Sequence, residues 1–238
     1  MALNAMIMIT HHRLFATWTL ALGLAACGGG DSATDPALTI TSNVAGAAIG
    51  PITFSFIFSD EVGASFTVDN IAVSAGTMGA FTKLSAVRYT LVVLPPADAT
   101  GSLSLSVAAN AFASLAGTPG AASASVSQAY DTLLPILALG SSAAGAVARS
   151  AVTLSFSFSE DVGNSFTIDD VLVSFTNGVG GLKGAFTRIS GTQASLVVSP
   201  PVGAAGTINI SVAAGTFSDL AGNANPITYF GAQQYDTR

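Results

Sequence analysis

The sequence is poor in charge and in the side chains that most often carry out catalysis. Only 8% of the 238 residues are charged, against roughly 25% in an average soluble domain, so Ser, Thr, Asn and Gly must supply most of the polar surface. Both histidines, His11 and His12, and the single tryptophan, Trp18, precede Cys27. A mature protein that begins at Cys27 therefore has no histidine, which removes the commonest general base and transition-metal ligand.

Cysteine and positive charge are also scarce. Cys27 is the only cysteine, which excludes an internal disulfide and a thiolate metal cluster. Thirteen acidic residues against seven basic ones give a net charge of −6. Such a surface repels phosphate backbones, and we expect no nucleic-acid partner.

Motifs of known catalytic sites are missing as well. The chain has no Gly-x-Ser-x-Gly elbow and no Ser-x-x-Lys pair, and its glycines at 178–184 do not fit a dinucleotide fingerprint. Paired carboxylates occur at 60–61, 160–161 and 169–170, but a glycoside hydrolase also needs aromatic sugar platforms, and most Phe residues occupy core-facing positions. We therefore expect no enzymatic activity.

The first 26 residues are typical of a signal peptide. A short polar n-region at 11–13 precedes an apolar run at 14–24 and the small residues Ala25 and Ala26. The apolar run is shorter than the roughly 20 residues that span a bilayer as a helix. We therefore expect a cleaved export signal at 1–26.

Leu24-Ala25-Ala26-Cys27 resembles the lipobox of bacterial lipoproteins. The resemblance implies that the Cys27 thiol is diacylated, for example with palmitate, that the chain is cut before it, and that the new amino terminus is acylated. Several acyl chains anchor a protein durably, which makes the membrane a partner. A glycine directly after the cysteine, as at Gly28, resembles the pattern in lipoproteins of the Gram-negative outer membrane. We therefore expect the protein to be located in the cell envelope. The alternative is an ordinary cleaved signal followed by an unmodified cysteine.

Beyond a flexible tether at 27–37, the sequence repeats itself. Residues 53–63 return at 153–163, a spacing of 100, while Tyr130 returns as Tyr235, a spacing of 105. The five extra residues are placed most simply in the glycine-rich stretch 177–181, and a difference in loop length marks a surface loop. We predict two domains, at 38–132 and 133–238.

Apolar and polar residues alternate within each copy, as expected of strands with one buried face. Phe54, Phe56 and Phe58 share one face, and Leu154, Phe156 and Phe158 share the equivalent one. Strand-like runs of the first copy lie at 38–44, 52–58, 70–75, 80–84, 88–94, 102–107 and 123–130. About seven short strands separated by turn residues predict an all-β protein with two tandem immunoglobulin-like β-sandwich domains.

Four segments of the second copy resemble the bacterial Ig-like repeats of large surface adhesins. They are Phe-Ser-Glu-Asp-Val at 158–162, Phe-Thr-Ile-Asp-Asp-Val at 166–171, Ser-Val-Ala-Ala-Gly at 211–215 and Asp-Leu-Ala-Gly-Asn at 219–223. The resemblance covers 38–237 and is looser in the first copy, where Ser-Leu-Ala-Gly-Thr stands at 114–118. It implies a spacer, stalk or adhesive module, but neither one ligand nor any reaction. A surface glycan or a protein is the class of ligand that we expect if the module is adhesive.

A rival hypothesis is a carbohydrate-binding or enzyme-accessory lipoprotein. Such a protein needs an exposed aromatic platform, for which Tyr89, Tyr229 and Phe230 are the candidates. Lys83 and Arg188 share an equivalent position after Ala-Phe-Thr and could touch a ligand. A charged residue on the solvent face that discourages edge pairing is the favoured interpretation of both.

Acidic residues of the second copy are predicted to converge. In an Ig sandwich, the start of strand A and the B–C and F–G loops lie at one pole. The residues placed there are Asp131 in the linker, Glu160 and Asp161 in the B–C loop, and Asp219 and Asn223 in the F–G loop. Gathered oxygen ligands are what Ca²⁺ requires, so we name a calcium site as a hypothesis.

The alternative is that Asp219 and Asn223 only shape a turn, while Glu160 and Asp161 lie in a solvated loop. The first copy offers Asp35, Asp60 and Glu61 at its own pole, but it has Ser114 at the position of the F–G aspartate. Its version of the site is expected to be poorer.

Overall fold

The computed structural model describes residues 35–120 and 125–238, which form antiparallel β-strands with two short 3-10 turns, η1 (Val68–Asn70) and η2 (Ile168–Asp170). The predicted all-β fold is therefore confirmed. The expected signal peptide, Cys27 and most of the tether lie outside the described residues. Within the described part, no helix has the length and apolar character needed to cross a membrane.

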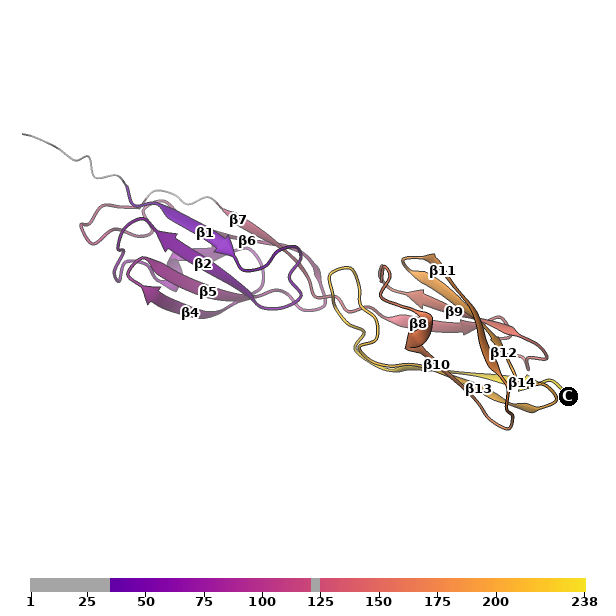
Figure 1. Cartoon of the computed structure of the whole chain (residues 1–238). Helices are drawn as coiled ribbons and strands as arrows, with labels where there is room; N and C mark the ends of the chain where they lie inside the picture. The colour runs from indigo at the N-terminus through magenta and orange to yellow at the C-terminus, as the bar shows by residue number, and fades with distance from the viewer. Residues whose placement is uncertain (1–34, 121–124) are drawn as a thin grey trace, which may run out of the picture. The chain divides into compact units, whose positions relative to one another are not determined.

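The first sandwich contains two sheets (Figure 1). One has the order β1-β2-β5-β4, from β1 (Leu38–Ser42), β2 (Ile52–Phe58), β5 (Arg88–Leu94) and β4 (Thr77–Ser85). The other has the order β3-β6-β7, from β3 (Ile71–Val73), β6 (Thr100–Val107) and β7 (Val126–Asp131). With β1 to β7 as strands A to G, these are the ABED and CFG sheets of a constant-type immunoglobulin domain.

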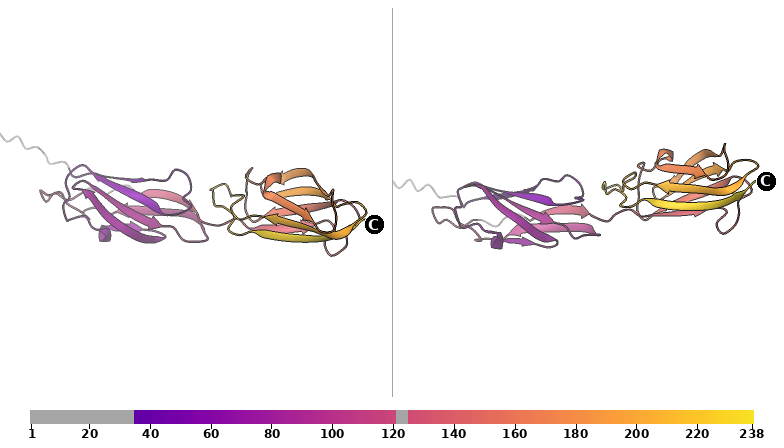
Figure 2. Two further views of the ribbon diagram at one scale, coloured as in Figure 1. Left: turned by 60° about the horizontal axis from the view of Figure 1, so that its bottom comes forward. Right: turned by 90° about the horizontal axis from the view of Figure 1, so that it is seen from below.

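The second sandwich repeats this topology strand for strand, and Figure 2 shows its strands from two further sides. Its first sheet has the order β11-β12-β9-β8, from β11 (Leu182–Ser190), β12 (Gln193–Ser199), β9 (Val152–Phe158) and β8 (Leu137–Ser141). Its second sheet has the order β10-β13-β14, from β10 (Val171–Phe175), β13 (Ala205–Val212) and β14 (Tyr229–Asp236). The five extra residues of this copy fall in the segment between β10 and β11, as predicted.

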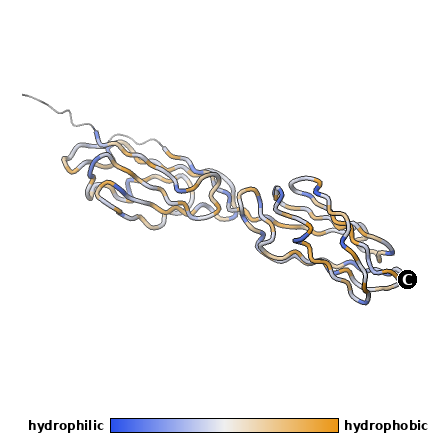
Figure 3. Tube along the Cα trace, viewed as in Figure 1, coloured by the Kyte–Doolittle hydropathy of each residue, from blue (hydrophilic) through white to orange (hydrophobic). Residues whose placement is uncertain are grey.

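Each sandwich has its own hydrophobic core, filled by every second residue of the inner strands. Phe54 and Phe56 of β2 and Phe156 of β9 are fully buried, whereas Ser157 between two buried phenylalanines is exposed. Figure 3 shows this alternation as hydrophobic and hydrophilic colours that change along the strands. Burial of one such ring contributes roughly 1.5–3 kcal/mol. The burial of these alternating side chains is therefore the main effect that specifies which face of each strand turns inward.

The B–C and F–G loops of each sandwich are tied together by one serine. In the second sandwich, Ser165 Oγ donates to Ser218 O at 2.6 Å and accepts from Ser218 N at 3.0 Å. In the first, Ser65 Oγ makes the same pair of bonds with Ala113, at 2.7 and 3.1 Å. The expected convergence of these two loops at one pole is thus present in both copies.

Candidate functional site

Three carboxylates meet at the pole of the second sandwich. Asp131 ends β7, Glu160 follows β9, and Asp219 lies in the F–G loop. One oxygen from each lies within 4.8 Å of the others. The structure therefore brings together four of the five residues that the sequence placed in a calcium site, these three carboxylates and Asn223, which contacts two of them.

Asp219 is held rigidly because it shapes the F–G turn. It is only 7% exposed, and its Oδ1 accepts hydrogen bonds from the backbone N–H groups of Gly222 at 2.7 Å and Asn223 at 2.9 Å. The Asn223 side chain donates from Nδ2 to Asp219 Oδ2 at 2.8 Å and to the carbonyl oxygen of Asp131 at 3.0 Å. Asn223 thus acts as a donor that fixes two of the three acidic residues, and the turn-shaping role holds alongside the carboxylate grouping.

Glu160 has the least favourable electrostatic surroundings of the three carboxylates. Its Oε1 is buried and has no hydrogen-bond partner. Desolvation, followed by the negative charges of Asp219 and Asp131, raises the pKa of Glu160 above its usual 4.5. An unpaired carboxylate oxygen next to two further carboxylates is an arrangement that a hard cation would relieve.

Asp161 lies apart from these carboxylates. It is exposed, and its Oδ1 accepts a hydrogen bond from Gly163 N at 2.7 Å within its own loop. The chain bends at residues 159 and 160, and the Asp161 side chain turns back onto its own loop. Asp161 instead shapes the loop.

The pole of the first sandwich differs at the predicted position. Ser114, which replaces the aspartate, accepts a hydrogen bond from Thr118 N through its Oγ at 3.2 Å. Asp60 Oδ2 accepts from Ser59 Oγ at 2.7 Å, and Asp35 is exposed. Within residues 35–120, no three acidic, His or Cys side chains approach one another as those of the second pole do.

The second pole offers chemistry suited to a hard cation. Ca²⁺ takes six to eight oxygen ligands, and three carboxylates leave room for water to complete such a set. Asp131, Glu160 and Asp219 are the residues that would hold the ion. The buried, unpartnered Oε1 of Glu160 fits this use.

Residues 32–130 match the family model of the bacterial Ig-like domain. The match covers the first repeat, which is less than half of the chain. The order of strands in the first repeat agrees with this match, and the second repeat has the same topology. No curated protein matches the chain.

Two solved structures are similar to the chain at low sequence identity. The Escherichia coli adhesin FdeC is 15% identical over 84% of this chain and 64% of its own, with a TM-score of 0.49. The Yersinia pseudotuberculosis adhesin InvE is 14% identical over 84% of this chain and 58% of its own, with a TM-score of 0.33. The chain thus spans less than two thirds of either structure.

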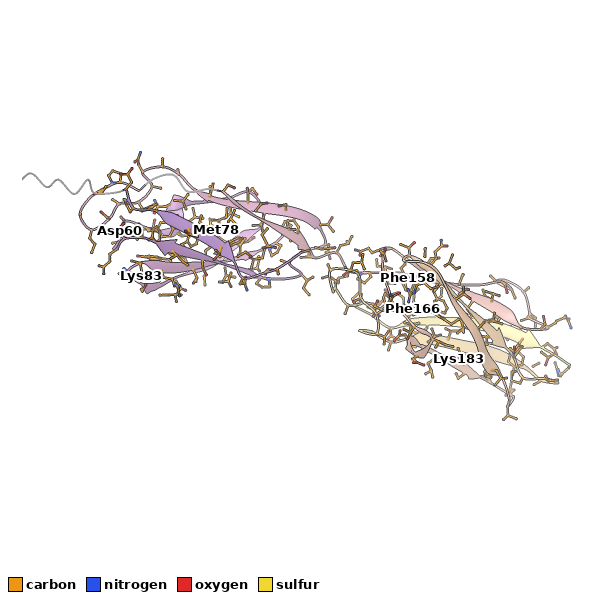
Figure 4. The ribbon with its side chains drawn as sticks, turned by 45° about the horizontal axis from the view of Figure 1, so that its top comes forward. Asp60, Met78, Lys83, Phe158, Phe166 and Lys183 are labelled. Atoms are coloured by element: carbon orange, nitrogen blue, oxygen red, sulfur yellow. The ribbon has the colours of Figure 1, made fainter. Side chains whose placement is uncertain are left out.

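The basic residues at equivalent positions of the two Ig-like repeats donate hydrogen bonds to backbone carbonyl oxygens of their own repeat. Arg188 donates through its two terminal nitrogens to the carbonyl oxygens of Gly163 and Phe166 in the B–C loop. Lys83, labelled in Figure 4, donates to Gly63 O at 3.3 Å, and its ammonium lies 5.5 Å from the ring centre of Tyr89. Sequence reasoning missed this role, although the equivalent positions of Lys83 and Arg188 marked the pair.

Only one of the three aromatic side chains proposed as a carbohydrate-binding platform is exposed. Tyr89 is 2% exposed and Tyr229 is 9% exposed, since both rings pack in the cores of their Ig-like repeats. Phe230 is 78% exposed. Of the three nominated aromatics, only Phe230 can meet a ligand.

Proposed function

We propose that the chain is an exported lipoprotein, anchored through Cys27, that displays two Ig-like repeats at the cell surface as a spacer or an adhesive module. The observation that carries this proposal is that one complete sandwich, with its own core, is built twice in succession. Duplication of a stable module extends reach and surface without requiring chemistry. The lipobox-like segment ahead of the repeats supplies the attachment.

A non-catalytic role agrees with the side chains of the described part. Its one group of neighbouring acidic residues, Asp131, Glu160 and Asp219, has no histidine or cysteine within it. The shared basic residue Arg188 is engaged with backbone carbonyl oxygens. Neither set pairs a nucleophile with a base in the way that covalent catalysis needs.

Labelling in cells tests the anchor and the surface location together. The wild-type chain should incorporate labelled palmitate, sediment with membranes and be degraded when intact cells are treated with protease. Cys27→Ser should abolish the label and release the protein from the membrane, whereas the neighbouring Ser32→Ala should change neither. A wild-type chain that is unlabelled and freely soluble would contradict the proposal.

We also propose that the second pole holds a calcium ion, and the unpartnered Oε1 of Glu160 is the observation that favours it. A ligand that binds only the folded state at a hundredfold excess over its Kd stabilises by about 2.7 kcal/mol. Calcium should therefore raise the melting temperature relative to a chelator, and Asp219→Asn should weaken this effect. Asp169→Asn, an exposed carboxylate outside the group, is the control. Identical melting curves with millimolar calcium and with chelator would refute the site.

A further inference from the structure

The second repeat has a pocket of about 430 Å³ at the open edge between its two sheets. The pocket lies between β8 and β14, each of which is the outermost strand of its sheet. Leu139, Leu154 and Ile210 supply its apolar lining, and none of its lining residues is charged. The pocket therefore suits an uncharged group with an apolar part.

The first repeat has a larger side chain at one position that lines the pocket. Val126 of β7 stands where β14 has Gly231, and Val126 packs against the first core. A Cβ on Gly231 would come within 3.3 Å of Leu139 Cδ1, so a larger side chain there would close the pocket.

The main chain of β14 has hydrogen-bonding groups available along this edge. Gln234 O accepts from Ala148 N, and Asp236 N donates to Ala148 O, so alternate residues of β14 turn their backbone groups away from β13. Ala232 has the same orientation, and no hydrogen bond to its backbone N–H or C=O is found in the described part of the chain along this edge. Ala148 thus covers the end of this edge, and the short stretch of β14 at Ala232 is left for an added strand to pair with.

An exposed aromatic side chain lies on the same strand. Phe230 is two residues before Ala232 and is 78% exposed. It is paired with Ser211 of the neighbouring strand β13, and Ser211 is paired on its other side with the exposed Leu172 of β10. The first repeat has the small residues Ser125 at the position of Phe230 and Ala72 at that of Leu172. A strand added beside β14 would place its own side chains against Phe230.

We infer that the open edge of β14 in the second repeat binds an extended, uncharged peptide segment of a partner protein, which adds a strand and inserts an apolar side chain into the pocket. This inference rests on the proposed surface function, because the partner must meet the repeat outside the cell. Strand addition gives affinity through the main chain and specificity through pockets for alternate side chains. Both features are present at this edge.

A sugar fits the same edge less well. The side-chain amide of Gln233 in the pocket is already satisfied, since Nε2 donates to Ala146 O at 2.7 Å and Gln234 O at 2.9 Å, and Oε1 accepts from Ser141 Oγ at 2.8 Å. The groups that remain are backbone groups at strand spacing, which match a peptide.

The test uses the full chain in detergent and a display library of random seven-residue peptides. Selection should enrich uncharged peptides with alternating apolar residues. Fluorescein-labelled copies of these peptides should bind the wild type and lose at least tenfold in affinity for Gly231→Val, which recreates the valine of the first repeat. They should lose a similar factor for Ala232→Pro, which removes a backbone donor that β13 does not use.

Ser127→Pro, the same change on the first repeat, is the matched control and should leave the affinity unchanged. Circular dichroism verifies that each variant is folded, and Gly231→Val decides alone if Ala232→Pro unfolds. The inference is overturned if no peptide is enriched, if the enriched peptides are charged, or if they bind Gly231→Val as they bind the wild type. A dimer of the chain that Ala232→Pro dissociates would overturn it in favour of a second copy. Palmitate labelling and membrane sedimentation do not depend on this edge, so failure here leaves the proposed function standing.

Discussion

The rings of Phe158 and Phe166 meet edge to face in the core of the second repeat, with centroids 4.9 Å apart (Figure 4). Phe58 and Phe66 repeat the contact in the first, at 4.8 Å. In each copy the first ring belongs to strand B and the second to the B–C loop, so the loop that carries the polar residues of the pole is bound to the core by an aromatic pair. Such pairs contribute about 0.5–1.5 kcal/mol beyond burial.

Truncation of these rings should be costly. Phe156→Ala and Phe158→Ala should each lower the free energy of unfolding by about 3–5 kcal/mol, because burial is lost and a cavity remains. Urea unfolding followed by circular dichroism measures the loss. Ser157→Ala, at the exposed position between them, should change stability by less than about 0.5 kcal/mol. Mild effects of both phenylalanine variants would contradict the observed facing of β9.

Arg188 should stabilise the B–C loop of the second repeat. Arg188→Met keeps the aliphatic stem but leaves the carbonyl oxygens of Gly163 and Phe166 without their charged donor. Hydrogen bonds to charged groups contribute about 1.5–3 kcal/mol, and we expect a loss at the lower end because water can reach the loop. Thermal melting measures it, with the exposed Arg149→Met as control. Equal melting temperatures of the two variants would show that Arg188 contributes nothing.

Removal of the charge on Glu160 should help the ion-free protein. Because burial and the neighbouring carboxylates raise the pKa of Glu160, its ionised form destabilises the folded state at neutral pH. That penalty disappears as the pH falls through the raised pKa and is absent below the usual value of 4.5. Without calcium, Glu160→Gln should therefore melt higher than the wild type at pH 7 and match it at low pH.

Solvent screening keeps the gain at pH 7 below about 1 kcal/mol. Melting curves in chelator over a range of pH test this, with Asp169→Asn as control. A variant that melts lower than the wild type at pH 7 would show that Glu160 is favourably paired when ionised.

Asp219 should matter to the fold whether or not an ion binds. Asp219→Ala removes the side-chain acceptor of the backbone N–H groups of Gly222 and Asn223 and one acceptor of the Asn223 amide. The Asn223 N–H is then left without an acceptor, and because a buried unsatisfied donor costs roughly 1–3 kcal/mol, we expect a clear drop in stability in chelator. Hydrogen exchange of the Gly222 and Asn223 amides should accelerate. Protection equal to the wild type would contradict the observed turn.

Sequence reasoning located the strands well, because the alternation that reveals a strand is local. The runs at 52–58 and 88–94 coincide with β2 and β5, and the run at 80–84 falls within the longer β4. The direction of a side chain could not be predicted where it depends on contacts outside the local segment. Tyr89 and Phe230 seemed equally suited to a platform, yet one ring is enclosed by its core and the other is exposed.

The sequence by itself determined that one sandwich is built twice and which face of strands such as 52–58 and 152–158 turns to the core, since the chain shows a period of two residues and a repeat of about 100. Only the tertiary structure decided that Glu160 and not Asp161 joins Asp131 and Asp219, and that Gly231 lines a pocket where Val126 of the first repeat packs against the core. Both outcomes depend on segments brought together from distant parts of the chain. Their side-chain directions follow from the way the two sheets and their loops pack, which no local pattern encodes.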